Sequence, residues 1–212
     1  MLYHIKKDMK KVFKVALIVI LIIALIVGGY FIYLNLTKKQ ALDTVDKMFT
    51  AIKTGDEEQI KQYINIDNLK EEEEEAKSNI DEDQEMEKIM LNNLNYEVIS
   101  TDVKFNQCTV KLNISNKNLK TVFGNYIAKA FSLAFSQAFG AMTEEEMDNQ
   151  LKQYFEEQYN SESTETITSE MTIDLKKENG KWTVNCDEDK FVDAVLPGYK
   201  EVVKSLNNLD KE

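Results

Sequence analysis

The side chains that most often carry out chemistry in proteins are scarce in this sequence and widely spaced. The only histidine is His4, and the only cysteines are Cys108 and Cys186. A histidine can act as a general base or bind a metal near neutral pH, and a thiolate can act as a nucleophile. Because His4 precedes a long apolar segment, we expect a membrane to separate it from the later residues. Those residues then have no histidine for acid–base or metal chemistry.

Carboxylates are abundant, but their spacing matches no catalytic or metal-binding motif. Glu71–Glu75 is an unbroken acidic run, and Asp81, Glu82 and Asp83 follow it. A calcium site on Asp81–Asp83 is one hypothesis, because Ca²⁺ prefers carboxylate oxygens. The spacing differs from an EF-hand loop and lacks its central glycine, so we interpret the run as a solvated charged segment. The sequence also has no Ser/His/Asp order and no phosphate-binding loop.

The apolar segment Val15–Leu36 holds 22 residues without a charge. At about 1.5 Å per residue it is long enough to cross a hydrocarbon core of about 30 Å. A cleaved signal peptide, cut near Val27 and Gly29, is the alternative. The apolar run continues past that point and places Tyr30 and Tyr33 where interfacial aromatic residues belong. We therefore predict an uncleaved transmembrane helix over residues 15–36, after a basic arm over residues 1–14.

Lysines predict the orientation of this helix. Five precede the span, whereas Lys38 and Lys39 are the only two that follow it closely. The positive-inside rule then places the N-terminus in the cytoplasm and residues 37–212 outside the cell membrane. Those outer residues carry 21 basic and 36 acidic side chains, a net charge of −15. Such a surface repels phosphates, which excludes a nucleic-acid partner and predicts repulsion from an anionic envelope.

The outer part begins with two predicted helices joined at Gly55-Asp56. Apolar residues recur at helical spacing from Ala41 to Ile52, and Gly55 is a typical residue just past a helix end. Asp56 is a suitable N-cap for a second helix that turns Ile60 inward. A third helix with Met86, Ile89, Met90 and Leu94 on one face precedes the strands.

Four strands are predicted from alternating apolar and polar residues, with a β-bulge in the first where the alternation slips by one residue. The turn Glu178–Lys181 joins the last two strands. The sequence predicts an α+β domain in which three helices pack on one face of a curved, four-stranded antiparallel sheet. The inward strand positions are the pocket candidates: Tyr96, Val98, Val110, Leu112, Met171, Ile173, Trp182 and Val184.

A helical insertion over residues 116–160 is predicted between the second and third strands. Two helical stripes rich in aromatic residues indicate an αα-hairpin, and Thr143 forms a capping box with Glu146 at the start of the second helix. The first stripe consists of Leu119, Val122, Phe123, Tyr126, Ile127, Ala130, Phe131, Ala134, Phe135 and Ala138. Phe123, Phe131 and Phe135 are its candidate contact residues. The hairpin either covers the core or forms a groove for a partner or ligand.

The stretches "MFTAIKTGDEEQIKQYI" and "LKKENGKWTVNCDE" resemble the NTF2-like, or cystatin-like cone, superfamily. They are most similar to its membrane-anchored domains of unknown function, the DUF4878 and DUF5105 types of low-GC Gram-positive bacteria. The resemblance covers the start and end of the outer part and excludes residues 116–160. It implies a cone-shaped domain of a kind used by enzymes, transport factors and VirB8-like scaffolds of conjugation machines.

No carboxylate occupies an inward strand position, so no buried acid is available for proton transfer. We therefore expect no enzyme activity, no cofactor and no metal. The leading hypothesis is an envelope scaffold that docks a protein partner. The alternative is a module that holds an apolar small molecule or peptide in the cone. An exposed aromatic patch on the hairpin would favour the first, and an unfilled cavity behind Trp182 and Tyr96 would favour the second.

The two cysteines are predicted to stay reduced. If the last three strands form a meander, one strand separates those that carry Cys108 and Cys186. Their Cα atoms are then about 9.6 Å apart, beyond the roughly 7 Å that a disulfide can span.

Overall fold

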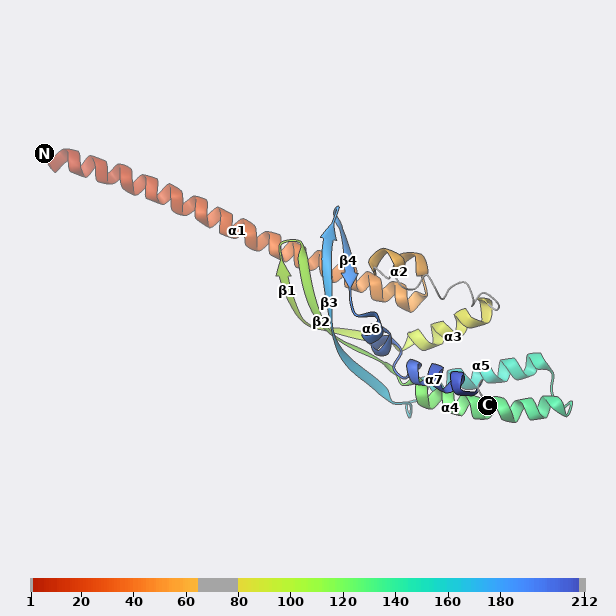
Figure 1. Cartoon of the computed structure of the whole chain (residues 1–212). Coiled ribbons are helices and arrows are strands. Elements are labelled where there is room, and N and C mark those ends of the chain that lie inside the picture. Colours follow the sequence, from red (N-terminus) through yellow and green to blue (C-terminus); the bar gives the residue numbers. More distant parts are fainter. Residues whose placement is uncertain (1, 65–79, 210–212) are drawn as a thin grey trace.

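The computed structural model describes residues 2–64 and 80–209, and Figure 1 shows their arrangement. Helix α1 runs without interruption from Leu2 to Thr54 and contains the apolar segment, both its flanks and the first predicted outer helix. The acidic run Glu71–Glu75 lies outside the described residues. Asp81–Asp83 belong to helix α3. The candidate membrane span and the folded part are thus joined by continuous helix, which transmits orientation better than a flexible linker would.

Helix α1 is long and apolar enough to cross a membrane, and it is the one such helix among the described residues. Its apolar window has a mean hydropathy of 2.9, and none of that window is buried inside the protein. An exposed surface of this length is stable only where lipid or another apolar phase covers it. The α+β class and a long apolar helix near the N-terminus, consistent with a membrane anchor, therefore agree with the sequence.

The Gly55-Asp56 corner forms as predicted. Gly55 adopts a φ of +66°, a backbone conformation that side chains other than glycine's disfavour. The Asp56 carboxylate accepts a hydrogen bond from the backbone N–H of Gln59 at 3.0 Å and caps helix α2, Glu57–Tyr63. Ile64 then pairs with Val184 at the edge of the sheet. The corner folds α2 back onto the same core that α1 covers.

The sheet is an antiparallel meander in the order β1-β2-β3-β4. Its strands are β1 Asn95–Lys104, β2 Gln107–Lys117, β3 Thr166–Glu178 and β4 Lys181–Asn185. The predicted bulge is confirmed: the β1–β2 register shifts between Val98 and Ser100, which leaves Ile99 unpaired. The three longer strands bend strongly along their length (Figure 1).

Helices α4, Leu119–Ala138, and α5, Glu144–Asn160, lie between β2 and β3 in the chain and pack against each other. Tyr126 of α4 meets Phe155 of α5 edge to face at 5.8 Å. The predicted capping box is present at Thr143 and Glu146. Figure 1 shows this helix pair reaching away from the sheet, on the side opposite the N-terminus.

The C-terminal segment forms α6, Glu188–Val195, and α7, Tyr199–Leu209, with a break at Pro197-Gly198 between them. The break also has a tertiary role, because the Pro197 carbonyl accepts a hydrogen bond from the backbone N–H of Leu119 at the start of α4. Gly198 has a φ of +88° and fits closely against the Asn118 side chain.

The helices on the sheet differ in part from the prediction. Helix α1 packs on β1 and β4, whereas α6 packs on β2 and β3. Helix α3, Ile80–Asn92, was expected to complete that layer. It gives Leu91 to the sheet core, but Met86, Ile89 and Met90 face the cluster formed by α4 and α5. The sequence shows which face of α3 is apolar. It does not show whether that face packs on the sheet core or on the cluster formed by α4 and α5.

Candidate functional site

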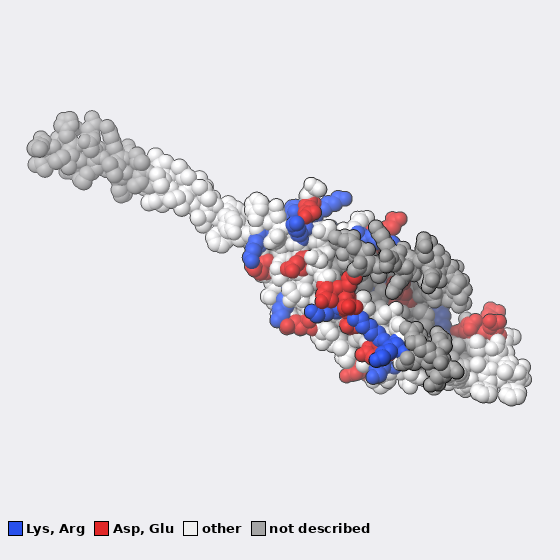
Figure 2. Space-filling model, in the orientation of Figure 1, with Lys and Arg blue, Asp and Glu red and all other residues white. Residues whose placement is uncertain are grey.

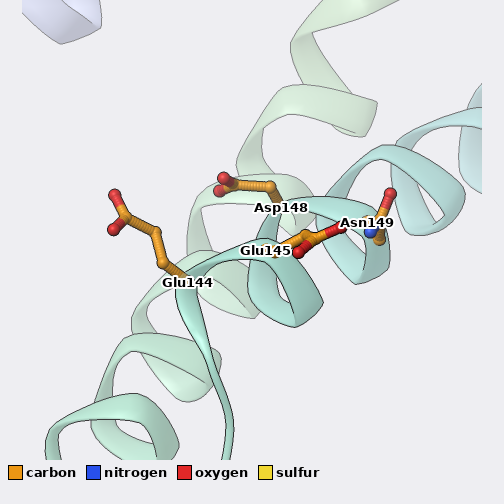
Figure 3. A pocket seen from close by; sticks show the side chains of 4 residues that line it. All are labelled: Glu144, Glu145, Asp148 and Asn149. Atoms are coloured by element: carbon orange, nitrogen blue, oxygen red, sulfur yellow. The ribbon is translucent and has the colours of Figure 1, made fainter.

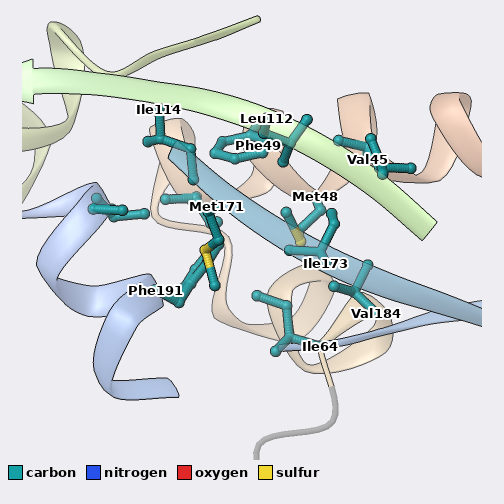
Figure 4. Close-up of a cluster of buried hydrophobic side chains, with 14 of the residues drawn as sticks. Val45, Met48, Phe49, Ile64, Leu112, Ile114, Met171, Ile173, Val184 and Phe191 are labelled. Carbon is teal, nitrogen blue, oxygen red and sulfur yellow. The ribbon is translucent and has the colours of Figure 1, made fainter. Parts of the chain in front are cut away.

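The pocket candidates on the sheet lie in the main hydrophobic core. Val110, Leu112, Ile173 and Val184 are fully buried, and Met171 and Trp182 are nearly so. Figure 4 shows how side chains from the helices fill the concave face of the sheet. The labelled helix residues include Val45, Met48 and Phe49 of α1 and Phe191 of α6. These six candidates therefore contact the protein's own side chains.

Tyr96 and Val98 lie at the margin of the same core and are half-buried. The Tyr96 ring stacks on Phe49 with 4.2 Å between centroids, and its hydroxyl donates a hydrogen bond to the Asp46 carboxylate at 2.8 Å. Burial raises the pKa of Tyr96, and the contact with Asp46 raises it further. A phenol held protonated in this way anchors α1 to β1 and is unsuited to act as a base near neutral pH.

Trp182 also lines a surface cavity of about 480 Å³ between α1, α2 and the β3–β4 turn. The Gln40 side-chain oxygen lies 3.5 Å from the Trp182 indole nitrogen and accepts a hydrogen bond from Lys177 Nζ at 2.7 Å. The remaining lining is mostly polar and includes Asp43, Thr44, Lys47 and Gln62. This cavity lies beside the core, and its polar lining does not suit an apolar ligand.

The helix pair presents an exposed aromatic stripe. Phe131, Phe135 and Phe139 are 63%, 68% and 85% exposed, and we call these three residues the phenylalanine stripe. Their spacing of four residues places them on one side of α4 and its C-cap. Phe139 was missed by the sequence analysis, although its distance of four residues from Phe135 was the signal that could have found it.

The buried face of α4 is rotated from the expected one. The sequence grouped Phe123, Phe131 and Phe135 in one apolar stripe with Leu119 and Val122. In the structure Leu119 and Val122 are buried and Phe123 is half-buried, whereas Phe131 and Phe135 are exposed. Leu133, which the predicted stripe omitted, is buried instead. Helix α4 is apolar on several faces, so hydrophobic periodicity could not decide which face α5 covers.

A buried polar network ties the helix pair to the sheet. The Asn116 side chain, fully buried on β2, donates hydrogen bonds to the backbone carbonyls of Met90 and Val195 at 2.9 and 2.7 Å. The Tyr159 hydroxyl of α5 lies 2.6 Å from the Met90 carbonyl and 3.0 Å from the Asn116 side-chain oxygen. Because α3, α5 and α6 all meet at Asn116, the network fixes the direction in which the helix pair projects.

An acidic hollow of about 450 Å³ lies beside the start of α5, lined by Glu144, Glu145, Asp148 and Asn149. Figure 3 shows the Glu144 and Glu145 side chains extending in different directions. Among the described residues, no three His, Cys, Asp or Glu side chains are placed to hold a metal ion together. The hollow adds negative charge at the start of α5, and Glu144 follows Phe139 by five residues in the chain.

The predicted free thiols are confirmed for both cysteines. Cys108 pairs with Leu175 on β3, and Leu175 pairs with Val184 on β4, so β3 separates the two cysteine positions. Burial raises the pKa of the Cys108 thiol. Burial, with the nearby Glu188 and Asp187 carboxylates, raises the pKa of Cys186 to about 11. Both thiols are therefore weak nucleophiles near neutral pH.

Comparison with protein-family models, with curated proteins and with solved structures finds no match to this chain.

Proposed function

We propose that this chain is a non-catalytic interaction module, anchored in the cell membrane by α1, that docks a protein partner of the envelope on the phenylalanine stripe. The observation that carries the proposal is the exposure of Phe131, Phe135 and Phe139 on one side of a helix. Aromatic side chains supply much of the binding energy at protein interfaces, and contiguous exposed apolar patches mark such sites.

The surroundings of the stripe define the kind of partner. Helix α5 begins five residues after Phe139 with Glu144, Glu145 and Glu146, and Asp148 follows. An apolar groove with a basic rim complements both the phenyl rings and these carboxylates. The helix pair holds the stripe on the side away from the membrane anchor (Figure 1), where a partner can reach it.

Photo-crosslinking in intact cells tests this proposal. A photoreactive amino acid at Phe135 should give a protein adduct of defined mass. Replacing Phe131 and Phe139 with serine should strongly reduce that adduct. Ile99 of β1, 45% exposed and outside the helix pair, is the control position. If both positions gave the same adducts, or if the serine substitutions changed nothing, the docking site would lie elsewhere.

The alternative function, an apolar small molecule or peptide held in the cone, has weaker support. Its lining candidates Val110, Leu112 and Ile173 already contact side chains of the core. Solvent extraction of the purified full chain tests it directly. A stoichiometric apolar molecule recovered from the protein would restore this alternative.

We further propose that the outer part is an NTF2-like domain with an αα-hairpin inserted over residues 116–160. The three helices before a bent four-strand meander support the proposal, as does the bulge in β1. The α6 and α7 helices extend that pattern. A short N-terminal arm, a single span and an outer cone also suit a VirB8-like secretion or conjugation scaffold.

We also propose that the N-terminus is cytoplasmic and that residues 37–212 lie outside, on the lysine asymmetry alone. A reporter that works only outside the membrane, fused after Glu212, should be active. Activity of a cytosolic reporter at the same position would instead show that residues 37–212 lie in the cytoplasm. Replacing the five early lysines with glutamine should weaken the bias, because positive charges before the span determine it.

A further inference from the structure

The turn between β1 and β2 lies directly against the apolar part of α1. The Tyr33 hydroxyl donates a hydrogen bond to the Phe105 backbone carbonyl at 2.7 Å and lies 3.1 Å from the Asn106 side-chain oxygen. The Tyr33 and Phe105 rings stack with 5.3 Å between centroids. Phe105 nevertheless stays 68% exposed. An exposed phenylalanine is thus fixed beside a residue that belongs to the predicted span, three positions before its last residue, Leu36.

The same end of the sheet carries a group of lysines. Lys104 ends β1, Lys176 and Lys177 lie near the end of β3, and Lys181 begins β4. The backbone N–H of Lys177 donates to the Asn106 carbonyl at 2.9 Å, so the two turns of the meander are neighbours. Lys38 and Lys39 follow on α1. We call these six lysines the basic rim.

The basic rim reverses the charge of the folded part locally. Asp102 and Glu178 are the acidic side chains paired with it, 3.7 Å from Lys104 and 2.7 Å from Lys176. Six lysines against the two carboxylates that pair with them make this end more positive than residues 37–212 as a whole, which carry −15. Figure 2 shows lysine side chains on the folded part next to where the apolar helix joins it.

We propose that this end of the sheet is a second membrane contact, with the basic rim on anionic phospholipid headgroups and Phe105 inserted at the boundary of headgroups and acyl chains. Aromatic side chains favour that boundary, and lysines near it are attracted to an anionic leaflet. The contact lies at the opposite end of the molecule from the phenylalanine stripe and does not depend on that stripe's function.

The fold supplies the geometry for this contact. Helix α1 continues without a break from the span into the folded part, where Thr37, Ala41 and Val45 are already buried. About 1.5 Å of rise per residue places Tyr33 only about 5 Å below the end of the apolar run. The turn that Tyr33 holds must therefore lie at the level of the headgroups. The net charge of residues 37–212 predicts repulsion from an anionic envelope. That repulsion does not apply at the basic rim, where lysines predominate.

Fluorescence quenching by lipids brominated near the top of their acyl chains tests the contact. The full chain is reconstituted in vesicles of phosphatidylcholine mixed with an equal amount of phosphatidylglycerol. The variant Phe105→Trp should gain a fluorescence component that these lipids quench. The matched variant Phe139→Trp, at the distal end, should gain a component that they do not quench. Trp182 contributes the same background to both. Equal quenching at positions 105 and 139 would overturn the proposal.

Lysine substitutions test the electrostatic part. In the Phe105→Trp chain, the triple change Lys38→Gln, Lys39→Gln and Lys181→Gln should reduce the quenching, because each lysine near an anionic leaflet strengthens association about fivefold. The matched triple Lys120→Gln, Lys129→Gln and Lys152→Gln changes the net charge equally on the helix pair and should leave the quenching unchanged. If both triples behaved alike, the basic rim would have no role in the contact.

Discussion

The sheet core and the helix pair use apolar residues for different purposes. On the sheet, the inward positions of all four strands meet side chains from α1 and α6 and form one large buried cluster. In the helix pair, the buried cluster of four residues comprises Leu119, Val122, Phe155 and Tyr159. Helix α4 carries more apolar surface than that small cluster covers, and the phenylalanine stripe is the exposed remainder. Stability therefore resides mainly in the sheet core, and the proposed docking surface lies on the helix pair.

The same substitution in the two regions gives the largest expected contrast. Phe49→Ala removes a fully buried ring that contacts Tyr96 and Phe191, and it should lower the free energy of unfolding by about 3–5 kcal/mol. Phe135→Ala removes an exposed ring and should change it by no more than about 0.5 kcal/mol. Denaturant unfolding of the full chain in detergent measures both. If the two variants changed the free energy of unfolding by similar amounts, Phe135 would also be a residue of the stabilising core and not of an exposed surface.

Gly180 and Gly198 both have a positive φ, but only Gly198 also packs closely against another region of the protein. Substituting each by alanine therefore compares backbone strain alone with strain plus a steric clash. Gly180→Ala should cost about 1–2 kcal/mol, because a side chain disfavours its φ of +83° while its Cβ would meet open space. Gly198→Ala should cost clearly more, because a Cβ there would lie 2.7 Å from the Asn118 side chain and 2.8 Å from the Lys120 backbone nitrogen. Thermal melts of both variants test this order. Equal losses would mean that the α6–α7 break does not pack tightly on α4.

Asn116 of the sheet and Tyr159 of the helix pair should contribute to stability in a non-additive way, because their side chains are in contact. Asn116→Ala removes the side-chain donor to the Met90 and Val195 carbonyls and should cost about 1–3 kcal/mol. Tyr159→Phe removes a hydroxyl whose two acceptors keep other donors, Asn116 and Lys117, and should cost about 0.5–1.5 kcal/mol. Because the two side chains contact each other, the double variant should cost less than the sum, with a coupling energy of roughly 1 kcal/mol. A double-mutant cycle measures that coupling. Strict additivity would show that the helix pair and the sheet are stabilised independently.

The smallest expected effect concerns the two thiols, and it is an effect on the rate of their alkylation. With a pKa of about 11, Cys186 is ionised in about one molecule in a thousand at pH 8. Its alkylation in the folded chain should therefore be slow and should rise about tenfold per pH unit up to about pH 11. Cys108 is buried and should react more slowly still. Thiol counting on the denatured, unreduced protein should find both free, and fast alkylation of Cys186 at pH 7 would contradict its burial.

Local patterns in the sequence were sufficient to predict most elements of this fold. Alternation gave the inward strand residues, the phase slip gave the bulge, and Gly55-Asp56 and Thr143–Glu146 gave the helix ends. Each of these signals depends on neighbours in the chain, where geometry is fixed by periods of about two or 3.6 residues. The span followed from length and the absence of charge alone.

Contacts between distant segments were decided by the tertiary structure. The face of α4 that α5 covers, the place of α6 on the sheet and the network at Asn116 each join residues far apart in the chain. The stacking of Phe105 on Tyr33, 72 positions away, is of the same kind. The hydrophobic effect has no direction, so an apolar residue in the sequence indicates only that its burial is favourable. Close packing in the folded protein determines which partner it contacts.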